Sequence, residues 1–244
     1  RGVVVEEWVK AAAAVDVGPA TVAPAAVAAA AACGSGAAAK WWFGKTLLWK
    51  IITYTLRAEG KIVLAVASSS VASLLLLAAR TAHSCFKLPL DLADISVCSI
   101  KKNTQLAKLI REMSLIIWDE APMIDHCCFK TFDKTLRDIL DMPKAIFGGK
   151  NVMLRGDFRQ TLPVKKNASR NEIIGSSIAE SYLWQHFKLR HLTENMRLTN
   201  GSMNEADREK VATFAKWLLD IGDGHLSTPD VDPQNTSWVD IPDD

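Results

Sequence analysis

The sequence predicts an α/β fold in which a mainly parallel sheet is covered by helices on both faces. Two observations lead to this prediction. Continuous apolar runs, such as Ile62–Ala67 and Leu115–Trp118, are typical of strands that are buried on both faces. Segments with apolar residues at helical spacing alternate with these runs along the chain. Strands that alternate with helices form parallel sheets, because each helix returns the chain to the edge where the previous strand began.

The regular pattern begins at Lys45. A helix is expected over Lys45–Arg57, and Gly60 can end it. We further expect helices over residues 68–79, 104–112, 122–140 and 204–221, and strands over residues 62–67, 115–118, 152–154 and 189–192.

Three regions differ in composition. Sixteen of the first forty residues are alanine, which leaves few large side chains to bury, so residues 1–40 are expected to form a poorly ordered extension outside the core. Residues 41–222 are expected to form the α/β domain. Residues 223–244 form an acidic tail without Lys or Arg, which does not suit contact with a phosphate backbone.

Composition and charge exclude some classes of protein. The chain has 29 Lys and Arg against 27 Asp and Glu, and a net charge of +2 excludes neither nucleic acid nor protein partners. No window holds about 18 strongly apolar residues, so no transmembrane helix and no membrane partner is expected. The amino-terminal acids Glu6 and Glu7 do not fit a secretory signal. Five cysteines without a CxxC pair indicate neither a disulfide framework nor a zinc site.

Two adjacent carboxylates follow the apolar run Leu115–Trp118. In open parallel sheets, ligands bind beyond the carboxyl ends of the strands. Asp119 at such an end can hold Mg²⁺, directly or through water, and Glu120 can polarise a water molecule that attacks the γ-phosphate of ATP. An apolar run followed by two acids also occurs at solvated turns, so this pair alone does not establish a nucleotide site.

A partner motif stands 74 residues earlier, at the start of the first predicted helix. Gly44, Lys45 and Thr46 match the second half of a phosphate-binding loop. Lys45 would reach the β- and γ-phosphates, Thr46 would contact Mg²⁺, and the helix amino terminus attracts phosphate. Ala39 stands where the loop pattern requires glycine, and two tryptophans lie between it and Gly44. Alternatively, residues 34–36 are the original start of the loop. In either case the loop is altered, and the alternative that it no longer binds phosphate stays open.

Two later segments supply further candidates. Gln160, in the sequence GDFRQ after the predicted strand over residues 152–154, is placed to sense a γ-phosphate or the attacking water. Arg197, in LTENMR after the next predicted strand, can stabilise charge on the transferring phosphoryl group. A polar turn and a surface arginine are the simpler interpretations of these two residues.

The order of the segments GKT, ASSSVASLL, RTAHSCF, IIWDEAPM, GDFRQTLPV and LTENMR resembles the Pif family of superfamily-one ATP-dependent DNA helicases. The resemblance covers most of the chain, from about Gly44 onward, and is closest to plant and Helitron-like members. It implies a RecA-like phosphate-loop NTPase domain, with ATP and Mg²⁺ as ligands and translocation 5′→3′ on single-stranded DNA. It also implies roles in DNA repair, recombination and telomere maintenance, and a nuclear location, with the mitochondrion as the alternative.

The resemblance also implies a DNA-binding surface. Segments 68–70 and 81–83 look like the family motifs that contact single-stranded DNA. Hydroxyl, imidazole and ring groups there can hold phosphates and stack on bases, and the candidates are Ser68, Ser69, Thr81, His83 and Phe86.

The sequence departs from the family pattern in several places. No glutamine precedes the phosphate loop to recognise adenine, because the first one is Gln105, and alanines replace the strand that normally leads into the loop. A second RecA-like domain, which would close the nucleotide cleft, is expected to be missing. Two alternatives to a working helicase therefore stay open: a catalytically dead, transposon-derived fragment that binds only DNA or protein, and a different phosphate-loop enzyme such as a nucleotide kinase.

Overall fold

The computed structural model describes residues 11–14, 44–76, 79–90, 96–165, 167–191 and 204–225. The chain divides into two compact units, Val9–Thr193 and a second unit made of Arg1–Trp8 with Glu194–Asp244. The helix expected over residues 204–221, within the predicted domain 41–222, lies in the second of these units. None of the described helices combines the length and the apolar character needed to cross a membrane.

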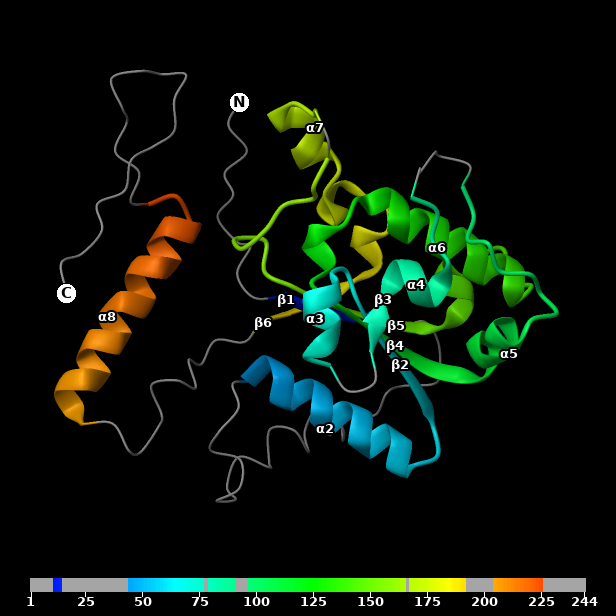
Figure 1. The fold of residues 1–244 in the computed structure, drawn as a ribbon, viewed down its shortest axis with the longest axis horizontal. Helices are drawn as coiled ribbons and strands as arrows, with labels where there is room; N and C mark the ends of the chain where they lie inside the picture. Colours follow the sequence, from blue (N-terminus) through cyan, green and yellow to red (C-terminus); the bar gives the residue numbers. More distant parts are fainter. Residues whose placement is uncertain are drawn as a thin grey trace. The chain divides into compact units, whose positions relative to one another are not determined.

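The first unit is built on one sheet (Figure 1). Among the described residues it has six strands in the order β3-β2-β4-β5-β1-β6. β2 pairs in parallel with both β3 and β4, and β4 pairs in parallel with β5. The strand bounds are β1 Ala11–Ala14, β2 Ile62–Ala67, β3 Arg80–Thr81, β4 Met113–Asp119, β5 Asn151–Arg155 and β6 Lys188–His191.

Helices lie on both faces of this sheet, as the sequence predicted (Figure 1). On one face, α2 packs Trp49, Ile52 and Leu56 against β2, β4 and β5. On the other face, α4, α5 and α6 enclose a larger core around Trp118, which is fully buried. The helix bounds are α2 Gly44–Ala58, α3 Ser70–Leu74, α4 Ala82–Phe86, α5 Gln105–Glu112, α6 His126–Ile139, α7 Arg170–Gly175 and α8 Glu205–Gly222.

Two predicted helices are shorter than expected because side chains cap them inside the predicted range. Ser69 accepts a hydrogen bond from Ala72 N and starts α3, which ends at Leu74. Asp125 accepts from Cys127 N and starts α6, so the segment before it forms only the short 3-10 helix η3, Ala121–Met123. Capping of this kind satisfies orphan backbone donors and fixes where a helix begins. The other 3-10 helices are η4 Ile146–Gly149, η5 Ile178–Glu180 and η6 Trp184–His186.

The expectation that residues 1–40 stay outside the core is wrong for Ala11–Ala14. These four alanines form β1, which lies between β5 and β6 and runs antiparallel to both. Side-chain burial did not predict this strand, because alanine offers little apolar area. The backbone explains it: the edge of β5 presents N–H and C=O groups that need partners, and any extended segment can supply them.

Candidate nucleotide site at the carboxyl edge of the sheet

The predicted acidic pair lies at the carboxyl end of β4. Asp119 is the last residue of the strand and is only 2% exposed. Its backbone oxygen accepts a hydrogen bond from Ser68 N at 3.0 Å, which joins the ends of β4 and β2. The carboxylate accepts from Glu120 N at 2.8 Å. The sheet therefore fixes the position of Asp119 from both sides.

Glu120 leaves the strand in an unusual backbone conformation. It has φ 50° and ψ 45°, in the left-handed region, where residues other than glycine are uncommon. Such conformations persist only where the surrounding structure holds them, and they cluster at functional sites. Here the turn is held by the loop after β5, because a Cβ on Gly156 would overlap the ring of Pro122. The turns that carry Glu120 and Gln160 are thus packed directly against each other.

The turn after β5 is organised by Asp157, a buried carboxylate that sequence reasoning missed. Asp157 is 7% exposed, and its carboxylate accepts a hydrogen bond from Arg159 N at 3.1 Å. The amide of Gln160 donates to the same carboxylate at 3.4 Å, and Gln160 N donates to the Asp157 carbonyl at 3.1 Å. Gln160 is therefore positioned at the predicted edge of the sheet, next to the end of β4.

The amino end of α2 reaches the same edge of the sheet. Gly44, Lys45 and Thr46 form its first turn, as predicted. α2 has 15 residues, which span about 22 Å. A short turn with Gly60 at φ 76° joins it to β2, whose six residues span about 20 Å. The helix thus runs back along the length of β2, and its amino end returns to the side where β2 and β4 end.

β1 runs in the opposite direction to a strand that would lead into a phosphate loop at the amino end of α2. Ala12 pairs with Arg155 and Ala14 pairs with Met153. The carboxyl end of β1 therefore lies toward the amino end of β5, away from Asp119. The sequence analysis expected alanines to replace the strand before the loop, and the structure adds that this strand is reversed.

Arg155 is the second charged residue at this edge that the sequence analysis did not select. It ends β5, and its guanidinium lies 3.1 Å from the Asp119 carboxylate. The side chains are 12% and 3% exposed, so this ion pair is almost shielded from water. A carboxylate that already accepts from Glu120 N and pairs with Arg155 does not fit the Mg²⁺ ligand role that the sequence predicted for Asp119.

The predicted DNA-contacting residues lie along the ends of β2 and β3. Ser68 Oγ accepts a hydrogen bond from Trp118 Nε1 at 3.0 Å, so this hydroxyl helps to hold the core tryptophan. Ser69 and Thr81 cap α3 and α4, with their hydroxyls accepting from Ala72 N and Ser84 N. Each hydroxyl keeps a hydrogen to donate, so their proposed contact with phosphate stays a prediction.

Phe86 corrects the prediction of a base-stacking ring. It is fully buried, and its ring centroid lies 4.3 Å from that of Phe132. The apolar side of α4 faces the core, which removes Phe86 from the surface. His83 on the same helix is partly exposed, and burial lowers the pKa of its imidazole. Arg197 lies outside the described residues.

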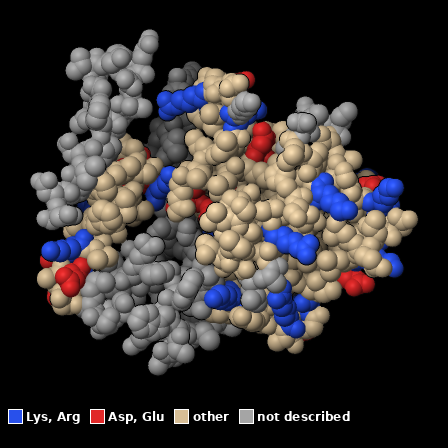
Figure 2. All heavy atoms as spheres, in the orientation of Figure 1, with Lys and Arg blue, Asp and Glu red and all other residues tan. Residues whose placement is uncertain are grey.

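On the face shown in Figure 2, the Lys and Arg side chains of the described residues are scattered and do not form a continuous stripe. Lys102 pairs with Asp138 at 3.2 Å and with Asp141 at 2.7 Å, and Arg111 donates to the Lys102 carbonyl. The segment that contains these cations is therefore bound to its own protein surface.

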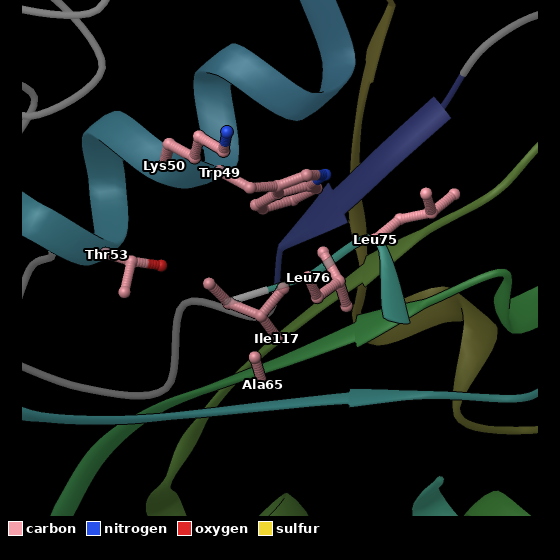
Figure 3. Close-up of a pocket in the computed structure, with 7 residues that line it drawn as sticks. All are labelled: Trp49, Lys50, Thr53, Ala65, Leu75, Leu76 and Ile117. Carbon is pink, nitrogen blue, oxygen red and sulfur yellow. The ribbon is translucent and has the colours of Figure 1, made fainter. Parts of the chain in front are cut away.

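A pocket between α2 and the sheet is too small for a nucleotide. Its free volume is about 20 Å³, which suits a single water molecule. Trp49 lies across its mouth, close to Leu76 and Ile117 (Figure 3). The buried Nε1 of Trp49 has no hydrogen-bond partner among the described residues, so one bound water would satisfy it.

Residues 125–127 bring three ligand-type side chains together at the start of α6. Asp125, His126 and Cys127 lie within 4.8 Å of one another, measured between their ligand atoms. However, Lys165 lies 3.7 Å from Asp125, and the positive end of the α6 dipole points at the cluster. This electrostatic setting disfavours a cation, so we do not assign a metal centre there.

The chain resembles one helicase family throughout most of its length. The family model for PIF1-like helicases matches residues 34–232. ATP-dependent DNA helicase PIF6 of Trypanosoma brucei brucei is 26% identical over 121 residues, which make up 50% of this chain and 12% of that protein. The chain thus spans a small part of the length of this curated relative.

Solved structures confirm the predicted RecA-like α/β fold. The Pif1 helicase from Candida albicans superposes with a TM-score of 0.57 at 25% identity, over 74% of this chain and 38% of that one. The Pif1 helicase from Bacteroides in complex with ADP-AlF3 and single-stranded DNA gives a TM-score of 0.58 at 22% identity, over 79% of this chain and 45% of that one. At this identity the second likeness shows the fold alone.

Proposed function

Because the chain belongs to the PIF1-like helicase family, we propose that it is the nucleotide-binding part of an ATP-dependent DNA helicase. The proposed activity is ATP hydrolysis coupled to 5′→3′ movement on single-stranded DNA and to duplex unwinding. One observation supports it most: Glu120 and Gln160 stand on two turns that pack together at the edge reached by the amino end of α2. Ligands of open α/β sheets bind at this edge.

Each residue has a proposed role in hydrolysis. The free N–H groups at the start of α2 and the side chain of Lys45 bind the phosphates, with Thr46 beside them. The carboxylate of Glu120 accepts the proton of the attacking water. Gln160, tied to Asp157, orients that water, and Arg197 stabilises charge on the transferring phosphoryl group. Asp119 has no proposed role as a Mg²⁺ ligand in these steps, because its carboxylate is paired with Arg155.

The test compares nucleotide binding and hydrolysis in matched variants. Lys45→Ala is expected to weaken binding of a fluorescent ATP analogue at least tenfold. Lys61→Ala is the control, because Lys61 precedes β2 at the opposite edge and forms a surface ion pair with Glu59. Glu120→Gln is expected to keep binding and to lose hydrolysis by about 10²-fold or more. Unchanged affinity in Lys45→Ala would refute the phosphate-loop assignment.

The alternative is a catalytically dead fragment of transposon origin that binds only DNA or protein. The Arg155–Asp119 ion pair favours it, because it occupies the carboxylate expected to serve the metal. ATP turnover stimulated by single-stranded DNA would exclude this alternative. Turnover no higher than that of Lys45→Ala would favour it.

Single-stranded DNA is the proposed partner, and Ser68, Ser69, Thr81 and His83 are the proposed contacts. His83→Ala is expected to weaken binding of a fluorescent oligothymidylate roughly fivefold or more, by loss of a stacking surface. His186→Ala, which removes an exposed imidazole on η6, is the control. Because the pKa of His83 is lowered, the imidazole is neutral near pH 7.5, and its removal is expected to leave the salt dependence of binding unchanged. Equal affinity in both variants would remove His83 from the surface that binds DNA.

The biological setting is proposed from the family. DNA repair, recombination and telomere maintenance are the expected processes, and the nucleus is the expected compartment, with the mitochondrion as the alternative. The nearness to plant and Helitron-like members also stays a prediction.

A further inference from the structure

The ion pair between Arg155 and Asp119 follows from the register of the sheet. Trp118 on β4 pairs with Leu154 on β5, so the next residues, Asp119 and Arg155, end the two strands side by side. Adjacent strands lie about 4.8 Å apart, and neighbouring residues at the same level face the same side of the sheet. The guanidinium and the carboxylate are therefore held together by the backbone and do not meet through a chance side-chain rotation.

The environment makes the guanidinium the counter-charge of Asp119. The carboxylate is 3% exposed, and a buried charge requires a compensating partner. Arg155 supplies a positive charge at 3.1 Å from this carboxylate. The buried Nε of Arg155 has no hydrogen-bond acceptor among the described residues, and Nη1 of the same guanidinium contacts the Asp119 carboxylate.

A divalent cation at Asp119 would meet strong opposition. It would approach a guanidinium of the same sign in a nearly dry site, where repulsion is poorly screened. It would also have to share a carboxylate oxygen with Arg155 or with Glu120 N, because each of these groups already contacts one of the two oxygens. Mg²⁺ binding at Asp119 therefore requires that Arg155 first leaves.

We propose that Arg155 is an internal cation that takes the place of Mg²⁺ at Asp119, so that this domain does not bind a divalent metal at the end of β4. This inference deepens the proposed function, on which it rests for the identity of the site. It predicts that nucleotide bound by this chain, if the phosphate-loop assignment is right, is held with the same affinity in EDTA and in millimolar Mg²⁺. Removal of the guanidinium is expected to create a metal site.

The first experiment uses the full chain without nucleotide, so that its result does not depend on ATP binding. Melting temperature is measured in EDTA and in 10 to 20 millimolar Mg²⁺, which is about 10 or more times a dissociation constant on the order of 1 millimolar. The wild-type chain is expected to show no shift. Arg155→Met is expected to melt several degrees lower in EDTA, because Asp119 loses its partner, and to recover part of that loss in Mg²⁺. In Arg155→Met/Asp119→Asn the Mg²⁺ response is expected to vanish.

Two controls keep the result specific. Arg57→Met removes an exposed arginine that donates to the Val63 carbonyl, and it is expected to gain no Mg²⁺ response. Arg155→Lys keeps the positive charge and is also expected to stay insensitive to Mg²⁺. A Mg²⁺ response in Arg155→Lys as large as in Arg155→Met would overturn the proposal.

A second measurement covers the case in which Arg155→Met does not fold. Binding of Mn²⁺ is followed by electron paramagnetic resonance in the wild-type chain and in Asp119→Asn. Equal Mn²⁺ binding is expected, because Arg155 already excludes the metal from Asp119. Weaker binding in Asp119→Asn would show that the wild-type carboxylate holds metal and would overturn the proposal. If Lys45→Ala left nucleotide affinity unchanged, the proposed function would fall, but these nucleotide-free results would still decide the role of Arg155.

Discussion

Replacement of Gly156 with alanine tests whether the turns after β4 and β5 form one packed unit. A Cβ at Gly156 would overlap the Pro122 ring and lie 2.6 Å from its Cγ, and 3.4 Å from Ala121 N. Carbon atoms in ordinary contact are about 3.5–4.0 Å apart, so the two turns must separate by about 1.5 Å or more to relieve the overlap with the Pro122 ring. Both turns are buried, and overpacking at such sites costs about 1–3 kcal/mol. We expect Gly156→Ala to lower the free energy of unfolding by that amount.

Urea unfolding followed by tryptophan fluorescence measures this loss. Gly175→Ala is the matched control, because Gly175 ends α7 with open space around the position of a Cβ. Alanine has the higher helix propensity, so this variant is expected to be up to about 1 kcal/mol more stable than the wild type. A Gly156→Ala chain within 0.5 kcal/mol of the wild type, roughly the size of ordinary surface effects, would refute the packing argument.

Two further predictions concern the buried carboxylate of Asp133. Asp133 is fully buried and accepts from Arg137, Phe147 N and the Tyr182 hydroxyl, so Asp133→Ala should lower the free energy of unfolding by about 3–5 kcal/mol. Asp138→Ala, at an exposed position on the same helix, is the control, with an expected loss of about 0–1 kcal/mol in the free energy of unfolding. Equal losses for the two variants in urea unfolding would contradict the argument. Burial, followed by the bond to Asp133, raises the pKa of Tyr182 from 10 to about 12. The stability that neutral Tyr182 contributes is therefore present below pH 10 and lost from pH 10 to about 12. If Tyr182→Phe lost as much stability as the wild type over this pH range, the loss could not be attributed to Tyr182.

The sequence predicted the elements well where local patterns are strong. The helix from Lys45, the buried strand over residues 62–67, the strand predicted over residues 115–118, which lies within β4, and the core position of Trp118 are all present. These succeed because helical periodicity and continuous apolar runs reflect burial directly. The placement of Asp119 and Glu120 at a strand end followed from the same patterns.

The sequence could not place side chains whose surroundings come from distant segments. The burial of Phe86 depends on Phe132, which lies on a helix 46 positions later in the chain. The contact between Gly156 and Pro122 joins two turns that are separated by a whole helix and strand. A local pattern carries no information on such contacts, because they depend on how the layers pack.

The fold class, the family and the positions of the candidate site residues along the chain could be predicted from the sequence. The tertiary structure alone decided the direction of β1 and the pairing of Arg155 with Asp119. The physical reason is the same in both cases. Backbone hydrogen bonding across the sheet sets which strand is a neighbour, its direction and its register, and these are properties of two segments that are far apart in the sequence. The sheet therefore decides which side chains become neighbours, and the identity of the side chains decides how those neighbours interact.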